Sequence, residues 1–144
     1  MRTNVRFRHP AEFIPVSDED GILGVGGAQW FVSLLRRVPG LQIDEELCQE
    51  DWGLVIFVQR NKKKFWIGLS QWPNSEQAWL AHCHHRSFAW LQRFSSSGKR
   101  ELERLVSDVH RALVSEASVS AVVWYEESQM RKAQPDGFAA PVGD

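Results

Sequence analysis

Residues 54–71 read LVIFVQR-NK-KKFWIGLSQ, two apolar runs separated only by the dipeptide Asn61-Lys62. Asparagine tolerates the positive φ that a two-residue hairpin turn requires, so the segment predicts two antiparallel strands joined by a tight turn. In that register Ile56 faces Ile67, and the apolar pairs on either side of them share one face. A slip by one residue would move all of these side chains to the other face, which favours this pairing.

A third strand is expected at residues 76–85, after the turn Pro73-Asn74-Ser75. If the loop has three residues, three apolar residues of the strand lie on the core side: Trp79, Ala81 and Cys83. A two-residue loop would instead bury His82 and His84, and imidazoles buried without partners are costly. We therefore expect the first register, with both histidines on the opposite face, near Trp66.

Further elements are expected on both sides of these strands. Before them the pattern indicates a strand at residues 4–9, a helix whose apolar stripe spans 30–38, and a poor edge strand or extended loop over 41–51. After them a helix is expected with its stripe at 102–113, followed by a β-branched strand at 119–126. The order β-α-β-β-β-β-α-β predicts an α+β fold, a mainly antiparallel sheet with two helices packed on one face.

The chain of 144 residues fits one domain, and 43% hydrophobic with 24% charged residues is typical of a globular protein. We expect residues 1–127 to form this domain. Residues 128–144 are polar and contain several helix and strand breakers, so a disordered tail is expected there. The glycine-rich run Gly24-Val25-Gly26-Gly27 matches no phosphate-binding spacing and is interpreted as loop.

Charge and hydropathy argue against two classes of partner. The net charge of −1 provides no general attraction to nucleic acid or to an anionic membrane. The basic run 60–64 is followed by Phe65 and Trp66, as a nucleic-acid site would require, but one short cluster is interpreted as a solvated hairpin tip. No apolar run approaches the ~18 residues that a membrane span needs, so a soluble, cytoplasmic protein is expected.

The sheet face away from the helices is the main candidate site. It would carry these side chains: Val55, Phe57, Trp66, Leu80, His82 and His84. An apolar patch rimmed by charge commonly marks a partner or ligand surface, and Trp66 beside Gly68 is the expected anchor. The alternative is that the N-terminal loop, the acidic segment 44–51 or a second copy of the chain covers this face. The acidic segment could itself attract a basic partner, or be a solvated loop.

A metal site is the second candidate. His82 and His84 are two residues apart on a strand, so they share a face and could chelate one ion. No third ligand is evident, although Glu76 or Asp51 could approach in space. Cys83 is interpreted as a core residue rather than a nucleophile, because its flanking histidines point to the opposite face. We expect no cofactor.

Two short motifs carry a resemblance: Glu50-Asp51-Trp52-Gly53 opening one strand, and Phe65-Trp66-Ile67-Gly68 on the next. The pattern resembles small bacterial domains of unknown function, some of which resemble immunity proteins that neutralise a toxin by binding it. The resemblance covers about half the chain and implies no catalytic residues. We expect a non-enzymatic binding module that holds a protein partner, a small ligand or a second copy. The alternative is a metal-dependent enzyme built on His82 and His84.

Overall fold

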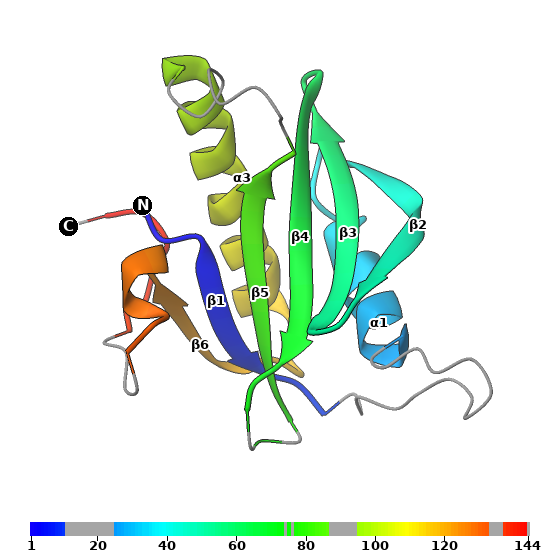
Figure 1. The fold of residues 1–144 in the computed structure, drawn as a ribbon, viewed down its shortest axis with the longest axis vertical. Helices are drawn as coiled ribbons and strands as arrows, with labels where there is room; N and C mark the ends of the chain where they lie inside the picture. Colours follow the sequence, from blue (N-terminus) through cyan, green and yellow to red (C-terminus); the bar gives the residue numbers. More distant parts are fainter. Residues whose placement is uncertain (11–24, 74, 76, 87–94, 133–136, 144) are drawn as a thin grey trace.

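The fold is described by a computed structural model that covers residues 1–10, 25–73, 75, 77–86, 95–132 and 137–143 (Figure 1). Its elements in chain order are β1 (Asn4–Arg8), α1 (Val25–Leu35), β2 (Gln42–Glu50), β3 (Gly53–Arg60), β4 (Lys63–Gln71), β5 (Ala78–His85), α3 (Ser96–Ser115), β6 (Ser120–Tyr125) and the 3-10 turn η1 (Glu127–Gln129). The expected α+β class and the order β-α-β-β-β-β-α-β are confirmed.

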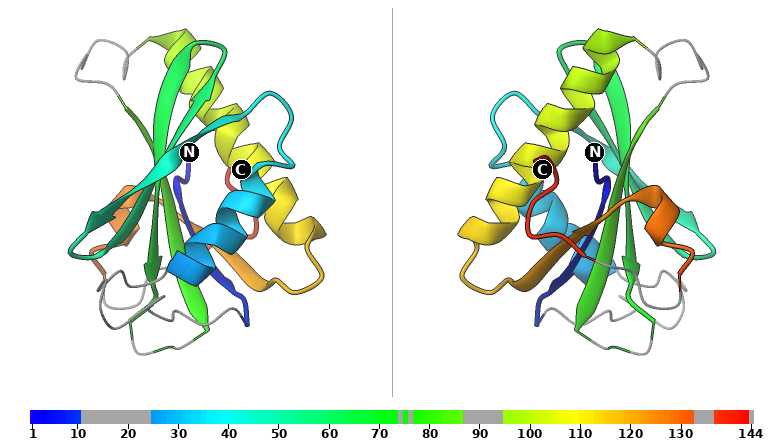
Figure 2. Two further views of the ribbon diagram at one scale, coloured as in Figure 1. Left: turned by 90° about the vertical axis from the view of Figure 1, so that its right-hand side faces the viewer. Right: turned by 90° about the vertical axis from the view of Figure 1, so that its left-hand side faces the viewer.

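The strands form one six-stranded sheet in the order β2-β3-β4-β5-β1-β6, and every neighbouring pair is antiparallel. The two helices of the described ranges, α1 and α3, lie against the same face of this sheet (Figure 2). The molecule therefore has two layers, and the opposite sheet face carries no helix among the described residues. We call it the open face; Figure 1 views the sheet from this side.

The register of the β3–β4 hairpin is confirmed. Ile56 is the Cα partner of Ile67, and both side chains are 0% exposed. Asn61 and Lys62 form the turn with φ values of 47° and 63°, the left-handed conformation that a two-residue hairpin with the twist of its strands requires. Turn chemistry and apolar alternation thus select the same pairing.

The β4–β5 register is also the expected one. Cys83 is opposite Ile67 in the core, whereas His82 and His84 are opposite Gly68 and Trp66 on the open face. The strand begins at Ala78, two residues later than the apolar pattern suggested. This register keeps the imidazoles out of the core between sheet and helices, which is the physical reason for it.

The two helices bury regular apolar stripes against the sheet. In α3 the buried side chains recur every three or four residues: Leu102, Leu105, Val106, Val109 and Leu113. Ser95 caps this helix, since its hydroxyl accepts a hydrogen bond from the amide of Gly98 at 3.1 Å. Neither described helix combines the length and apolar character that crossing a membrane demands.

Helix α1 begins at Val25, so part of the glycine-rich run expected as loop is helical. The reason is a close approach to the sheet. A Cβ at Gly27 would lie 1.8 Å from Cη2 of Trp79, which means that only glycine lets the helix pack over this buried indole. The contact joins residues far apart in sequence, and local patterns do not reveal it.

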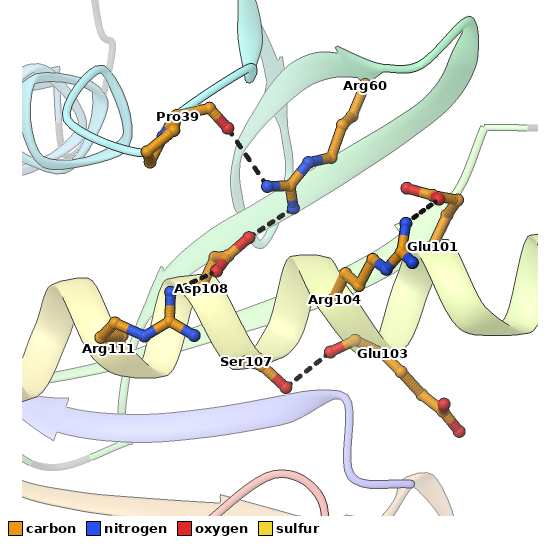
Figure 3. Close-up of polar contacts among 8 residues, drawn as sticks. All are labelled: Pro39, Arg60, Glu101, Glu103, Arg104, Ser107, Asp108 and Arg111. Carbon is orange, nitrogen blue, oxygen red and sulfur yellow. Dashed lines mark hydrogen bonds and ion pairs between the residues drawn. The ribbon is translucent and has the colours of Figure 1, made fainter.

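An ion-pair network fastens the β3–β4 hairpin to the helical layer (Figure 3). Arg60 donates hydrogen bonds to the Asp108 carboxylate of α3 and, at 3.1 Å, to the carbonyl oxygen of Pro39. Arg111 donates to the other oxygen of the same carboxylate at 2.8 Å. Arg60 is therefore held by an ion pair and a hydrogen bond, whereas the basic run 60–64 was interpreted as a solvated hairpin tip.

Residues 137–143 lie on the domain and do not follow the expectation of a disordered tail from residue 128. Phe138 and Trp124 exchange two backbone hydrogen bonds of 2.7 and 2.9 Å. The guanidinium of Arg2 lies 3.6 Å from the centroid of the Phe138 ring and donates to the carbonyl oxygen of Ala140 at 2.9 Å. Backbone pairing and one cation–π contact need no periodic apolar pattern, so the sequence did not reveal them.

Candidate functional site

All five residues expected in the site lie on strands β3, β4 and β5 with their positions on the open face: Phe57, Trp66, Leu80, His82 and His84. The structure brings three of them into ring contact, namely Trp66, His82 and His84. Leu80 lies farther along β5, opposite Ser70 on one side and Arg6 on the other. The expected surface is therefore centred on β4 and β5.

A fourth ring, Trp52 from the turn between β2 and β3, completes this group. Trp66 and His84 are stacked with ring centroids 4.5 Å apart at 24°. His82 meets Trp66 edge-on at 5.2 Å, and Trp52 meets His82 in the same manner at 4.9 Å. We call Trp52, Trp66, His82 and His84 the aromatic cluster.

Trp52 was part of a motif in the sequence but was not assigned to the site. Its side chain is 45% exposed, although it lies over the sheet. Gly68 makes this possible, because a Cβ there would be 2.7 Å from Cη2 of Trp52 and 1.8 Å from Nε2 of His82. The missing side chain at Gly68 leaves the floor on which both rings pack.

His82 is uncharged at neutral pH. Burial, with a further contribution from the neighbouring His84, lowers its pKa from 6.5 to about 4, while Glu127 opposes this shift. The Nε2 atom is buried and has no hydrogen-bond partner within the described ranges. An imidazole in this setting behaves as a flat, neutral ring rather than as a cation.

The structure adds no further ligand to the alternative metal site at His82 and His84. His82 and His84 share the open face, with ring centroids 5.3 Å apart. However, the proximity of Nε2 of His82 to Gly68 leaves only Nδ1 to reach an ion. Within the described chain no group of three His, Cys, Asp or Glu side chains is arranged to hold a metal. Glu76, one of the two candidate third ligands, lies outside the described residues.

Cys83 is a core residue, as expected. Its side chain is fully buried, and burial raises the pKa of its thiol to about 12. At neutral pH the thiolate required of a nucleophile is therefore scarcely populated. The structure offers no support for covalent catalysis at this position.

Arginines lie over other rings of the open face. Arg86 lies 4.0 Å from the ring centroid of Phe57, so this expected binding residue is covered on one side by the chain itself. Arg6 lies 5.1 Å from Trp72, which stacks on Tyr125 at 6.0 Å. These rings form a second, cation-covered group near β1 and β6.

The aromatic cluster borders a hollow of about 510 Å³ at one end of the sheet. Its walls include Trp66 and His84 of the sheet, Lys99 and Leu102 of α3, Glu127 of η1, and Met1. Glu127 accepts a hydrogen bond from Nδ2 of the buried Asn4 at 3.2 Å, which holds its carboxylate in place. Sequence reasoning missed Glu127 because it follows β6 in a turn, where no periodicity fixes its direction.

Comparison with known proteins identified no relative: no protein-family model, no curated protein and no solved structure matches the chain. The functional argument therefore rests on the geometry of the open face. The N-terminal loop that was considered as a cover for this face, residues 11–24, lies outside the described residues.

Proposed function

We propose that this chain is a non-enzymatic binding module whose open face binds a protein partner, with Trp66 as the anchor. One observation carries the proposal: four rings, including two tryptophans, gather on a sheet face that no described helix covers. Tryptophan is enriched among the residues that dominate binding energy at protein interfaces. Trp52, at 45% exposed, offers a large apolar surface that a partner could desolvate.

The tryptophans of the core give the contrast that supports this assignment. Trp79 and Trp124 are 1% and 0% exposed and belong to the core between sheet and helices. Trp66 is only partly buried, and its neighbours are other surface rings. Packing of the core therefore does not account for the tryptophans of the aromatic cluster.

The resemblance to immunity-type proteins favours a particular biological setting within this proposal. A partner such as a toxin in a bacterial cytoplasm would be neutralised by being bound, without any catalytic group on this chain. The buried, protonated thiol of Cys83 and the neutral His82 agree with a surface that acts through contact.

The test is affinity capture from the source organism, followed by calorimetric titration of the captured protein against variants. Trp66→Ala is expected to weaken binding by about 2 kcal/mol or more while lowering the free energy of unfolding only modestly. Trp79→Ala, a core control, should cost ~3–5 kcal/mol of stability. Val114→Ala, on the exposed side of α3, should leave binding unchanged. Equal affinity for Trp66→Ala and the wild type would refute the proposal.

A further inference from the structure

Arginine side chains of the chain itself lie over several buried or partly buried rings but not over those of the aromatic cluster. The observed pairs are Arg86 over Phe57, Arg6 over Trp72 and Tyr125, and Arg2 over Phe138. No arginine or lysine of the described ranges lies in this way over Trp52 or Trp66. One π-face of Trp66 is covered by the stacked His84, so a cation from outside can approach the other face of Trp66 and the exposed surface of Trp52.

The hollow beside Trp66 contains one carboxylate, that of Glu127, and is also lined by Lys99 and Met1. Glu127 lines the same hollow as Trp66 and forms no ion pair with any described residue. Its Oε2 is held by Asn4, and its Oε1 accepts no hydrogen bond within the described part of the chain. Glu50 and Asp51 directly precede Trp52. The neutral His82 does not compensate these charges.

We propose that the aromatic cluster is a subsite for an arginine side chain presented by the protein partner, and this inference rests on the proposed function. The guanidinium stacks on the face of the Trp66 indole opposite His84 and pairs with the Glu127 carboxylate. Arginine fits better than lysine, because its planar, weakly hydrated guanidinium both stacks on an aromatic face and donates several hydrogen bonds to a carboxylate. A negatively charged ligand would gain neither contact.

Lys99 allows the charge of the ligand to be tested by its effect on affinity. It lines the hollow with Glu127 and has no ion-pair partner among the described residues. Its ammonium repels a bound cation, so neutralising Lys99 strengthens arginine binding whereas neutralising Glu127 weakens it. An anionic ligand would produce the reverse pair of effects.

The experiment titrates the full chain with three short peptides: acetyl-Gly-Arg-Gly-amide, its citrulline analogue, which has the same shape without the charge, and acetyl-Gly-Glu-Gly-amide. The indole N–H signals of Trp52 and Trp66 are followed by nuclear magnetic resonance, after assignment with Trp→Phe variants. The arginine peptide is expected to shift both signals saturably and to bind at least about fivefold more tightly than the citrulline peptide. Added salt should reduce this difference.

Two variants decide the result. Glu127→Gln, which retains an acceptor for Asn4, is expected to weaken the arginine peptide about fivefold or more, and Lys99→Met to strengthen it. Equal binding of the citrulline peptide, preference for the glutamate peptide, or an unchanged affinity in Glu127→Gln overturns the inference. If the arginine preference is absent but Trp66→Ala still abolishes binding of the captured partner, only the subsite fails. If Trp66→Ala leaves that binding intact, the proposed function fails as well.

Discussion

His82 couples protonation to folding, because its imidazole is buried among rings. Its pKa in the fold is about 4, below the ordinary 6.5, so the unfolded chain takes up the proton first as the pH falls. Above pH 6.5 the group is neutral in both states and its full contribution to stability is present. Between pH 6.5 and about 4 the unfolded state binds more protons, and the free energy of unfolding decreases.

We predict that acidification from pH 7 to 4 costs at most about 3 kcal/mol through His82 alone. The measurement is urea denaturation across this range for the wild type and for His82→Phe, which keeps a ring but cannot titrate. As the pH falls, the free energy of unfolding of the wild type should decrease more than that of His82→Phe. His9 and His110, whose pKa values are also lowered by burial, contribute to both proteins and cancel. Parallel pH profiles would show that His82 protonates freely in the fold.

Gly68 sets the floor of the aromatic cluster, and its substitution by alanine should disturb the rings above it. The added Cβ would lie 1.8 Å from Nε2 of His82 and 2.7 Å from Trp52, so both side chains must move. We expect a stability loss of about 1–3 kcal/mol and greater acrylamide quenching of Trp52 fluorescence. Ser70→Ala, at the next open-face position of β4, is the control. Unchanged quenching in Gly68→Ala would mean that Trp52 does not rest on this glycine.

At the scale of elements, Arg60 links the hairpin to α3 through a partly buried carboxylate. The side chains of Arg60 and Asp108 are 15% and 12% exposed, whereas Arg104, paired with Glu101 on the same helix, is 61% exposed. We predict that Arg60→Ala costs about 1–2 kcal/mol of stability and Arg104→Ala about 0.5 kcal/mol or less. Chemical denaturation of both variants tests this, and equal costs would remove the distinction between the two pairs.

The strands on which the site lies could be predicted from the sequence because their signals are local. Apolar alternation and the Asn61-Lys62 turn fixed the hairpin, and the cost of burying imidazoles selected the register of β5. These local features are sufficient to put Trp66, His82 and His84 on one face of the sheet. The start of α1 could not be predicted in the same way, since it depends on Gly27 meeting Trp79.

The remaining site residues lie in turns, where the periodicity of the sequence does not predict which way a side chain points. Trp52 is in a turn, and Glu127 is in the 3-10 turn after β6, so strand alternation assigns neither side chain to a face. The covering of Phe57 by Arg86 likewise depends on how the chain continues after β5, since Arg86 must reach across β4 to a ring on β3. Such contacts are decided by the tertiary structure, which is why the sequence predicted a surface but not its carboxylate or its cation-covered rings.

Across the whole molecule, the two edges of the sheet are protected differently. β2 exposes most of its side chains, and the acidic residues Asp44, Glu45 and Glu46 lie at a register irregularity in its pairing with β3. Charge and irregular pairing both discourage the addition of another strand. β6 is instead covered in part by the C-terminal residues, through the pairing of Phe138 with Trp124.

Deleting residues 137–144 should therefore lower stability. The deletion removes the backbone pairing at Trp124 and the partner of the Arg2 guanidinium. We predict a fall in thermal midpoint of roughly 5 °C or more, corresponding to about 1 kcal/mol or more in a domain of this size. Removing only Gly143 and Asp144 provides the control, and scanning calorimetry the measurement. An unchanged midpoint for the longer deletion would mean that this segment contributes nothing to the fold.

The position of β1 has a consequence for how the protein is made. β1 lies between β5 and β6, so Asn4 pairs with both His82 and Tyr125. Ribosomes add roughly 5–20 residues per second, so this strand waits on the order of ten seconds before its second neighbour has been synthesised. During that interval Val5 and Phe7, both buried in the finished sheet, lack the neighbouring strand β6. The nascent chain thus closes its sheet only after β6 has left the ribosome.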